Sequence, residues 1–147
     1  MLLVADGAQE ATIRRYRKLL EQEGAEVYVT TSLPFLSVTT VNDDLRGEEV
    51  MVDIPLELVD VKMFDGVIVP NGSLCAEALY ADPIVVRLIE RFIGLRKRVI
   101  LSGEVREWAA EGICEESNVC VLDYIGLQWH VHVLQFLLGD TSTVVIR

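Results

Sequence analysis

Short runs of apolar residues recur along this chain, and their length constrains the fold more than any other feature of the sequence. Five such runs stand at residues 2–5, 27–29, 67–69, 99–101 and 119–122. Runs this short, apolar on both faces, are typical of strands in a parallel sheet that helices cover on each side. The sequence therefore predicts an α/β fold, a three-layer sandwich with a mainly parallel sheet.

The segments between the apolar runs carry the spacing and the end signals of helices. Residues 10–23 place their apolar side chains on one stripe, and Gly24 follows at the position of a left-handed C-cap. Asp82 and Pro83 form an N-cap followed by proline at the first helical position. Residues 126–138 are apolar on nearly all sides, so we expect a helix buried in the core or at a subunit contact.

One segment departs from this alternation of strand and helix. Residues 36–54 are rich in β-forming side chains around a turn that contains Asn42, Asp43 and Asp44. This pattern predicts a β-hairpin inserted outside the parallel core. The chain of 147 residues shows no repeat and no linker, which indicates a single domain over residues 1–147.

The charge balance narrows the classes of partner. The net charge is -10, with 13 Lys and Arg against 23 Asp and Glu. A surface this acidic repels phosphate backbones and anionic lipid headgroups, so we expect no nucleic acid and no membrane as partner. No apolar run is long enough to span a bilayer, and the opening residues lack the basic start of a signal peptide. We therefore expect a cytoplasmic protein.

The cysteines and histidines show no metal-binding spacing. Cys75, Cys114 and Cys120 include no CxxC pair, which favours reduced thiols over a disulfide framework or a zinc site. His130 and His132 lie two positions apart in the expected last helix, so their side chains point to different faces. We expect no metal and no cofactor.

Three stretches carry a resemblance to a known family. They are ADGAQEATI at residues 5–13, FDGVIVPNGS at residues 64–73 and KRVILSGEVREWAAEG at residues 97–112. With these three stretches in this order, the chain resembles the ThiJ/PfpI superfamily, whose fold is of the flavodoxin-like, class I glutamine amidotransferase type. The resemblance spans residues 1 to 122, and it implies a homodimer.

The resemblance also implies a catalytic site, but the residues that would form it differ here. The family's nucleophilic cysteine, at the elbow after the fourth core strand, falls at Gly103, and its glutamate falls at Thr12. Glu10 is two residues away, which on a helix is the other face. The chain therefore resembles a divergent member that lacks the usual nucleophile. We predict a positive φ at Gly103, because an elbow needs strained backbone angles that glycine adopts without steric cost.

Two other side chains near these turns are candidate nucleophiles. Cys75 falls in the expected first turn of the helix after the Pro70–Ser73 turn, where the helix dipole lowers a thiol pKa. Ser102 precedes Gly103, but no histidine stands near it in sequence to act as its base. A buried inert cysteine and a small residue that ends a strand are the ordinary interpretations of Cys75 and Ser102.

These observations support one leading hypothesis and two alternatives. The leading one is a small-molecule-binding or assembly module without the family's cysteine-based hydrolase or deglycase activity. Its predicted ligand pocket lies at the carboxyl ends of the strands. The pocket residues are Asp6, Glu10, Gly72, Ser73, Cys75, Gly103 and Glu104. The first alternative is a hydrolase or glyoxalase/deglycase-like enzyme that uses Cys75. The second, a flavodoxin-like receiver or flavin carrier, is disfavoured because Pro70, Asn71 and Gly72 stand where a receiver needs its acceptor aspartate.

Overall fold

A five-stranded parallel sheet forms the centre of the molecule. The computed structural model describes residues 1–32, 36–103, 112, 116–122, 133, 136 and 137. The strands are β1 (Leu2–Leu3), β2 (Val29–Thr30), β5 (Gly66–Val69), β6 (Arg98–Ser102) and β7 (Val119–Leu122). Their order across the sheet is β2-β1-β5-β6-β7, and every described pair is parallel. Each expected apolar run supplies one of these strands, as the sequence predicts.

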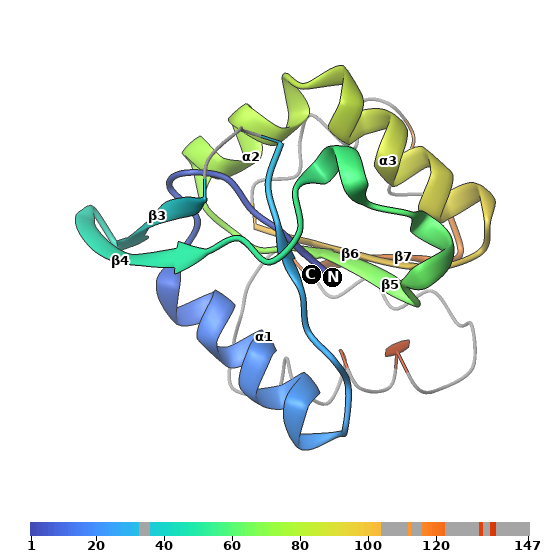
Figure 1. The fold of residues 1–147 in the computed structure, drawn as a ribbon, viewed down its shortest axis with the longest axis horizontal. Helices are drawn as coiled ribbons and strands as arrows, with labels where there is room; N and C mark the ends of the chain where they lie inside the picture. The colour runs from blue at the N-terminus through green and yellow to red at the C-terminus, as the bar shows by residue number, and fades with distance from the viewer. Residues whose placement is uncertain (33–35, 104–111, 113–115, 123–132, 134–135, 138–147) are drawn as a thin grey trace.

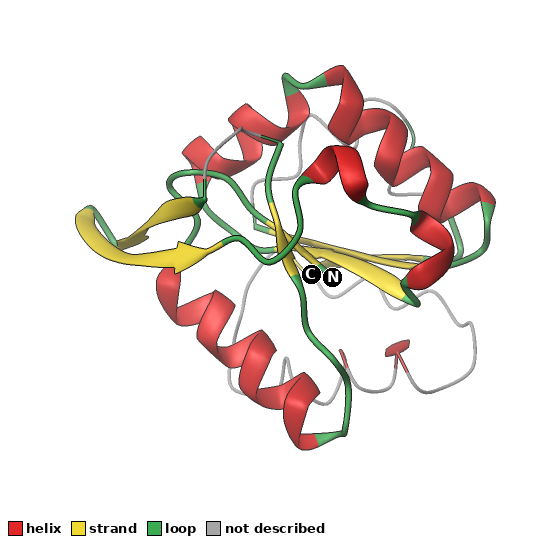
Figure 2. Cartoon of the chain, in the orientation of Figure 1, coloured by secondary structure: helices red, strands yellow, loops and turns green. Residues whose placement is uncertain are grey.

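Helices cover both faces of this sheet. Helix α1 (Glu10–Gln22) lies on one face, and α2 (Ser73–Tyr80) and α3 (Pro83–Gly94) lie together on the other (Figures 1 and 2). The side chains of β1 and β7 are buried throughout, as is required of strands enclosed between two helical layers. The predicted three-layer α/β sandwich is confirmed.

The helix ends lie where the local sequence signals place them. The Asp82 carboxylate accepts a hydrogen bond from the Ile84 backbone N–H at 2.9 Å, and Pro83 opens α3. Helix α1 ends at Gln22, and Gly24 follows with a φ of +82°. Local sequence signals therefore mark the start of α3 and the end of α1.

The inserted hairpin consists of β3 (Ser37–Asn42) and β4 (Leu45–Met51), which pair with each other and not with the central sheet. It projects from the side of the molecule beside the start of α1 (Figure 1). The Val41 N–H donates to the Ala8 carbonyl at 2.9 Å, and the Gly7 N–H donates to the Thr39 carbonyl at 3.0 Å. The turn between β1 and α1 therefore holds the hairpin in place.

Two short 3-10 helices, which the sequence pattern does not predict, connect the hairpin to β5. They are η1 (Leu56–Leu58) and η2 (Val61–Met63). Leu56 and Val61 are buried in the core, while Leu58 and Met63 are exposed. Each turn is three residues long, too short for a hydrophobic periodicity to be visible in the sequence.

Most of the expected last helix lies outside the described residues, together with Cys114, His130 and His132. Of residues 126–138, the structure describes Val133, Phe136 and Leu137, of which the first two are buried. The Arg98 guanidinium lies 5.3 Å from the centroid of the Phe136 ring. Among the described residues, no helix has the length and hydrophobicity to cross a membrane.

A buried polar contact joins α1 to β6. The hydroxyls of Tyr16 and Ser102 are 2.7 Å apart, and both side chains are buried. Burial raises the Tyr16 pKa, and it raises the pKa of the neighbouring Cys120 thiol to about 11. The interior beneath α1 therefore holds these groups in their neutral, protonated forms.

This burial predicts a loss of stability at alkaline pH. Below the usual Cys pKa of 9.0, Cys120 keeps its proton in both the folded and the unfolded chain, so its contribution is complete. Between pH 9.0 and about pH 11, only the unfolded chain releases the proton, so the free energy of unfolding falls by roughly 2 kcal/mol. Urea titrations from neutral pH to about 11 measure this slope. The Cys120→Val variant should show a shallower slope, and an unchanged slope would contradict the assignment.

Candidate functional site

The turns at the carboxyl edge of the sheet lie against one another. The turn after β1 contains Gly7, the turn after β5 contains Asn71 and Gly72, and Gly103 follows β6. The N–H of Gln9, at the start of α1, donates to the Asn71 carbonyl at 2.9 Å. A Cβ on Gly72 would collide with the Gly7 carbonyl oxygen. The backbones of these turns are therefore in direct contact.

Gly103, directly after β6, has a left-handed backbone conformation and no room for a side chain. Gly103 has a φ of +78°, which confirms the predicted left-handed conformation. A Cβ built on it would lie 2.5 Å from the Asn71 Cβ and 3.2 Å from the Asn71 Cα. Asn71 therefore occupies the space that an elbow side chain would enter.

Asn71 also presents a buried polar atom at this point. Its Oδ1 is enclosed, and it makes no hydrogen bond within the part of the chain that the structure describes. An amide oxygen withdrawn from water without a donor is destabilising by about 1–3 kcal/mol. Asn71 therefore brings a buried amide oxygen as well as its Cβ to the contact with Gly103.

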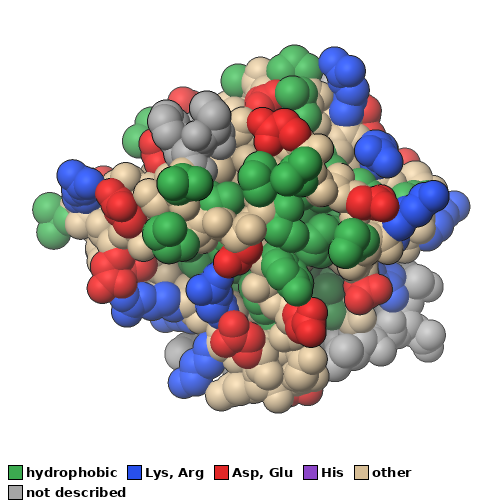
Figure 3. Space-filling model, in the orientation of Figure 1, with side chains coloured by type: hydrophobic (Ala, Val, Ile, Leu, Met, Phe, Trp, Pro, Cys, Tyr) green, Lys and Arg blue, Asp and Glu red, His purple; other side chains and the backbone are tan. Residues whose placement is uncertain are grey.

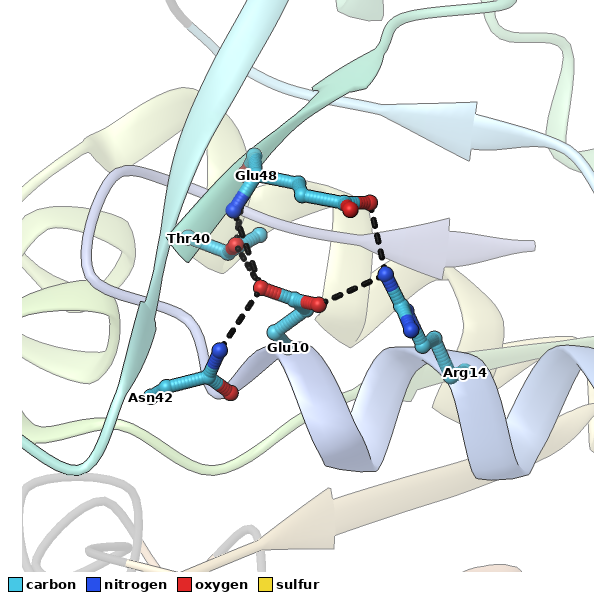
Figure 4. A network of polar contacts seen from close by, with 5 residues as sticks. All are labelled: Glu10, Arg14, Thr40, Asn42 and Glu48. Atoms are coloured by element: carbon cyan, nitrogen blue, oxygen red, sulfur yellow. Dashed lines mark hydrogen bonds and ion pairs between the residues drawn. The ribbon is translucent and has the colours of Figure 1, made fainter. Parts of the chain in front are cut away.

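Two of the three acidic residues of the predicted pocket, Asp6 and Glu10, bind the hairpin. The Asp6 carboxylate accepts from the Thr39 N–H at 2.9 Å. The Glu10 carboxylate accepts from the Glu48 N–H at 2.9 Å and from the Asn42 side-chain amide at 3.0 Å (Figure 4). Both carboxylates are therefore engaged by structural hydrogen bonds.

Glu10 is the most enclosed acid of this network. It is 6% exposed, and its other oxygen lies 2.7 Å from the Arg14 guanidinium (Figure 4). A Cβ on Gly47 would lie 2.5 Å from the Glu10 carboxylate oxygen, so only glycine at that position leaves room for the carboxylate. Glu10 therefore joins α1 to the hairpin, and Thr12, where the sequence resemblance places a glutamate, is buried.

The candidate nucleophiles are both enclosed. Cys75 is fully buried in the first turn of α2, and its Sγ accepts from the Ala5 N–H at 3.3 Å. Ser102 is 2% exposed, and its hydroxyl is hydrogen-bonded to Tyr16. Ser73 is exposed at the start of α2, and Glu104 lies outside the described residues. Within the described ranges, no group of three or more His, Cys, Asp or Glu side chains is placed to hold a metal ion.

A cavity lies at the opposite, amino edge of the sheet, where sequence reasoning predicts none. Its volume is about 620 Å³, and it lies between the end of α1 and the starts of β1, β5 and β6. Its lining residues are spread along the chain from Met1 to Leu137, without a shared motif. Only the folded arrangement brings these residues together, and no local signal in the sequence could have located them.

Comparison with known proteins gives matches among solved structures only. No family model matches the sequence. No curated protein matches it either. Oxidized DJ-1 from Toxoplasma gondii is 18% identical with a TM-score of 0.68, over 78% of this chain and 61% of that one. A cysteine-to-alanine mutant of a DJ-1 superfamily protein from Salmonella typhimurium has the same identity and TM-score, over 92% of this chain and 84% of that one.

A third match extends over nearly the whole chain. The ThiJ/PfpI domain protein from Brachyspira murdochii is 16% identical with a TM-score of 0.65, over 99% of this chain and 76% of that one. This chain has the fold of the DJ-1/ThiJ/PfpI superfamily. At such identities the likeness shows the fold alone. The chain spans between 31% and 61% of the length of three of the matching structures.

The structural role of Glu10 in this DJ-1/ThiJ/PfpI fold predicts a large effect of its removal. The variant Glu10→Ala leaves the Glu48 N–H and the Asn42 amide without their acceptor, which should lower the free energy of unfolding by roughly 2–4 kcal/mol. The control Glu49→Ala removes an exposed carboxylate of the same hairpin and should change it by less than about 1 kcal/mol. Urea unfolding measures both, and equal effects would contradict the role.

The contact between Asn71 and Gly103 predicts that substitutions at the two positions are coupled. Gly103→Ala alone should destabilise by about 2 kcal/mol, because its Cβ meets the Asn71 Cβ at a positive φ. Combined with Asn71→Gly, which removes the colliding atom, the loss should be smaller than the sum of the two single losses by about 1 kcal/mol. Urea unfolding of the unaltered chain, the two single variants and the double variant measures this coupling. Additive losses would show that the two residues do not compete for space.

Proposed function

We propose that this chain is a small-molecule-binding or assembly module that lacks the cysteine-based chemistry of enzymes with this fold. The observation that carries the proposal is the packing of Asn71 against Gly103. It leaves neither a nucleophile at the elbow nor the space for one. Covalent catalysis requires both a reactive side chain and room for the substrate atom that it attacks.

The other groups at this edge support the same proposal. A general base must reach the proton it removes, but the Glu10 carboxylate is occupied by the hairpin and by Arg14. Ser102 is enclosed with Tyr16 beneath α1. No pair of nucleophile and base is therefore assembled among the residues described at the carboxyl edge.

Assembly rests on exposed apolar side chains around the hairpin. Leu36, Leu45 and Met51 are between 63% and 81% exposed on or beside the two hairpin strands. Figure 3 shows further apolar side chains grouped on the face between the hairpin and the helices α2 and α3. Exposed groups of this kind are typical of contact surfaces, and a second copy of the chain is the partner we propose.

The alternative function, an enzyme that uses Cys75, has one observation in its favour. Cys75 lies in the first turn of α2, where the helix dipole stabilises a thiolate. Its side chain is 0% exposed, however, so a substrate reaches Sγ only if α2 or the turn after β1 moves. Burial of Cys75 therefore favours the non-catalytic proposal.

Turnover and thiol labelling separate the two functions. The protein should convert methylglyoxal and a chromogenic ester no faster than Cys75→Ser does, and iodoacetamide should label Cys75 much more slowly in the folded chain than in urea. The variant Cys120→Ser, which changes another buried cysteine, is the matched control. Turnover that is lost in Cys75→Ser and kept in Cys120→Ser would establish the enzyme and overturn the proposal.

A further inference from the structure

The cavity at the amino edge of the sheet has the dimensions of a small-molecule site. Its volume of about 620 Å³ falls within the range of roughly 300–1,000 Å³ that is usual for ligand pockets. It is visible as a hollow on the face drawn in Figure 3, with apolar side chains at its base and acidic side chains near its rim. It lies at the end of the strands opposite to Gly103, so a ligand bound here would not touch the elbow.

The base of the cavity is apolar and partly aromatic. Val27, Phe64 and Ile68 contribute side chains from the segments leading into β2 and β5 and from β5 itself. The rings of Tyr28 and Phe64 pack edge to face, with centroids 5.8 Å apart. An aromatic pair beside an aliphatic wall favours a ligand with an apolar body, and its ring faces attract cations.

The charged residues that line the cavity are mostly acidic. Glu23, Glu26 and Asp65 are exposed, while Arg98 is half-buried with its guanidinium over Phe136. The Met1 amine donates to the Gly66 carbonyl, and burial lowers its pKa to about 6, so it is largely neutral at physiological pH. The net charge of the chain, -10, adds to this negative local field.

We propose that this cavity binds an organic cation, an ammonium group attached to an apolar body, with the apolar part against Tyr28 and Phe64 and the ammonium beside Glu26 and Asp65. The inference deepens the proposed function, since it locates the small-molecule site of a non-catalytic module. A neutral apolar ligand would gain nothing from the acidic rim, and an anion would be repelled by it. The apolar base and the acidic rim together therefore select the class of ligand.

Two probes with the same alkyl chain and opposite charge test the proposal. Hexylammonium should produce saturable shifts in the amide NMR signals of Tyr28, Gly66 and Ile68, and hexanoate should bind at least fivefold more weakly, about 1 kcal/mol. Glu26→Gln/Asp65→Asn should weaken hexylammonium binding by about fivefold. Asp44→Asn/Glu77→Gln removes the same charge from exposed positions elsewhere and should leave binding unchanged.

Four outcomes would overturn the proposal. They are the absence of saturable shifts, equal binding of hexanoate, an equal loss in the two double variants, and shifts that change on dilution without a probe. The last would identify a second copy of the chain as the occupant. Turnover that depends on Cys75 would overturn the proposed function and leave the binding result intact, whereas absent binding with absent turnover would overturn this inference alone.

Discussion

Direct contact between backbone turns at the carboxyl edge of the sheet is the constraint on which the rest of the structure depends. Gly72 lies against Gly7, Gln9 donates to the Asn71 carbonyl, and Gly103 faces the Asn71 side chain. The approaches at Gly72 and Gly103 require that a glycine contribute no Cβ. These glycines therefore bring the turns into contact at the edge where the sequence predicts a ligand pocket.

The hairpin follows from this arrangement, because an isolated two-stranded ribbon is at best marginally stable in water. It gains its stability from the turn after β1 and from Glu10, whose buried carboxylate accepts hydrogen bonds from both of its strands. A carboxylate saturated by such donors has little capacity left for a ligand. At this edge the Glu10 carboxylate therefore stabilises the hairpin and is not available to bind a ligand.

Sequence reasoning predicts the parts of this fold that local chemistry controls. The short apolar runs predict the strands, and Asp82 and Pro83 predict the start of α3. The resemblance to the ThiJ/PfpI superfamily predicts the positive φ of Gly103. It does not predict what lies beside Gly103, because Asn71 is thirty-two positions away and nothing near either residue encodes their contact. The role of Glu10 is also invisible in the sequence, since its hydrogen-bond partners lie thirty or more residues along the chain.

The two edges of the sheet differ in what surrounds their acidic groups. At the carboxyl edge, hydrogen-bond donors from the hairpin engage Asp6 and Glu10. At the amino edge, Glu23 and Asp65 are exposed beside a cavity with an apolar base. A charge next to a low-dielectric wall acts on a ligand more strongly than one surrounded by water. The amino edge, which carries no sequence motif, therefore combines a cavity with exposed negative charge, and a ligand is expected to bind there.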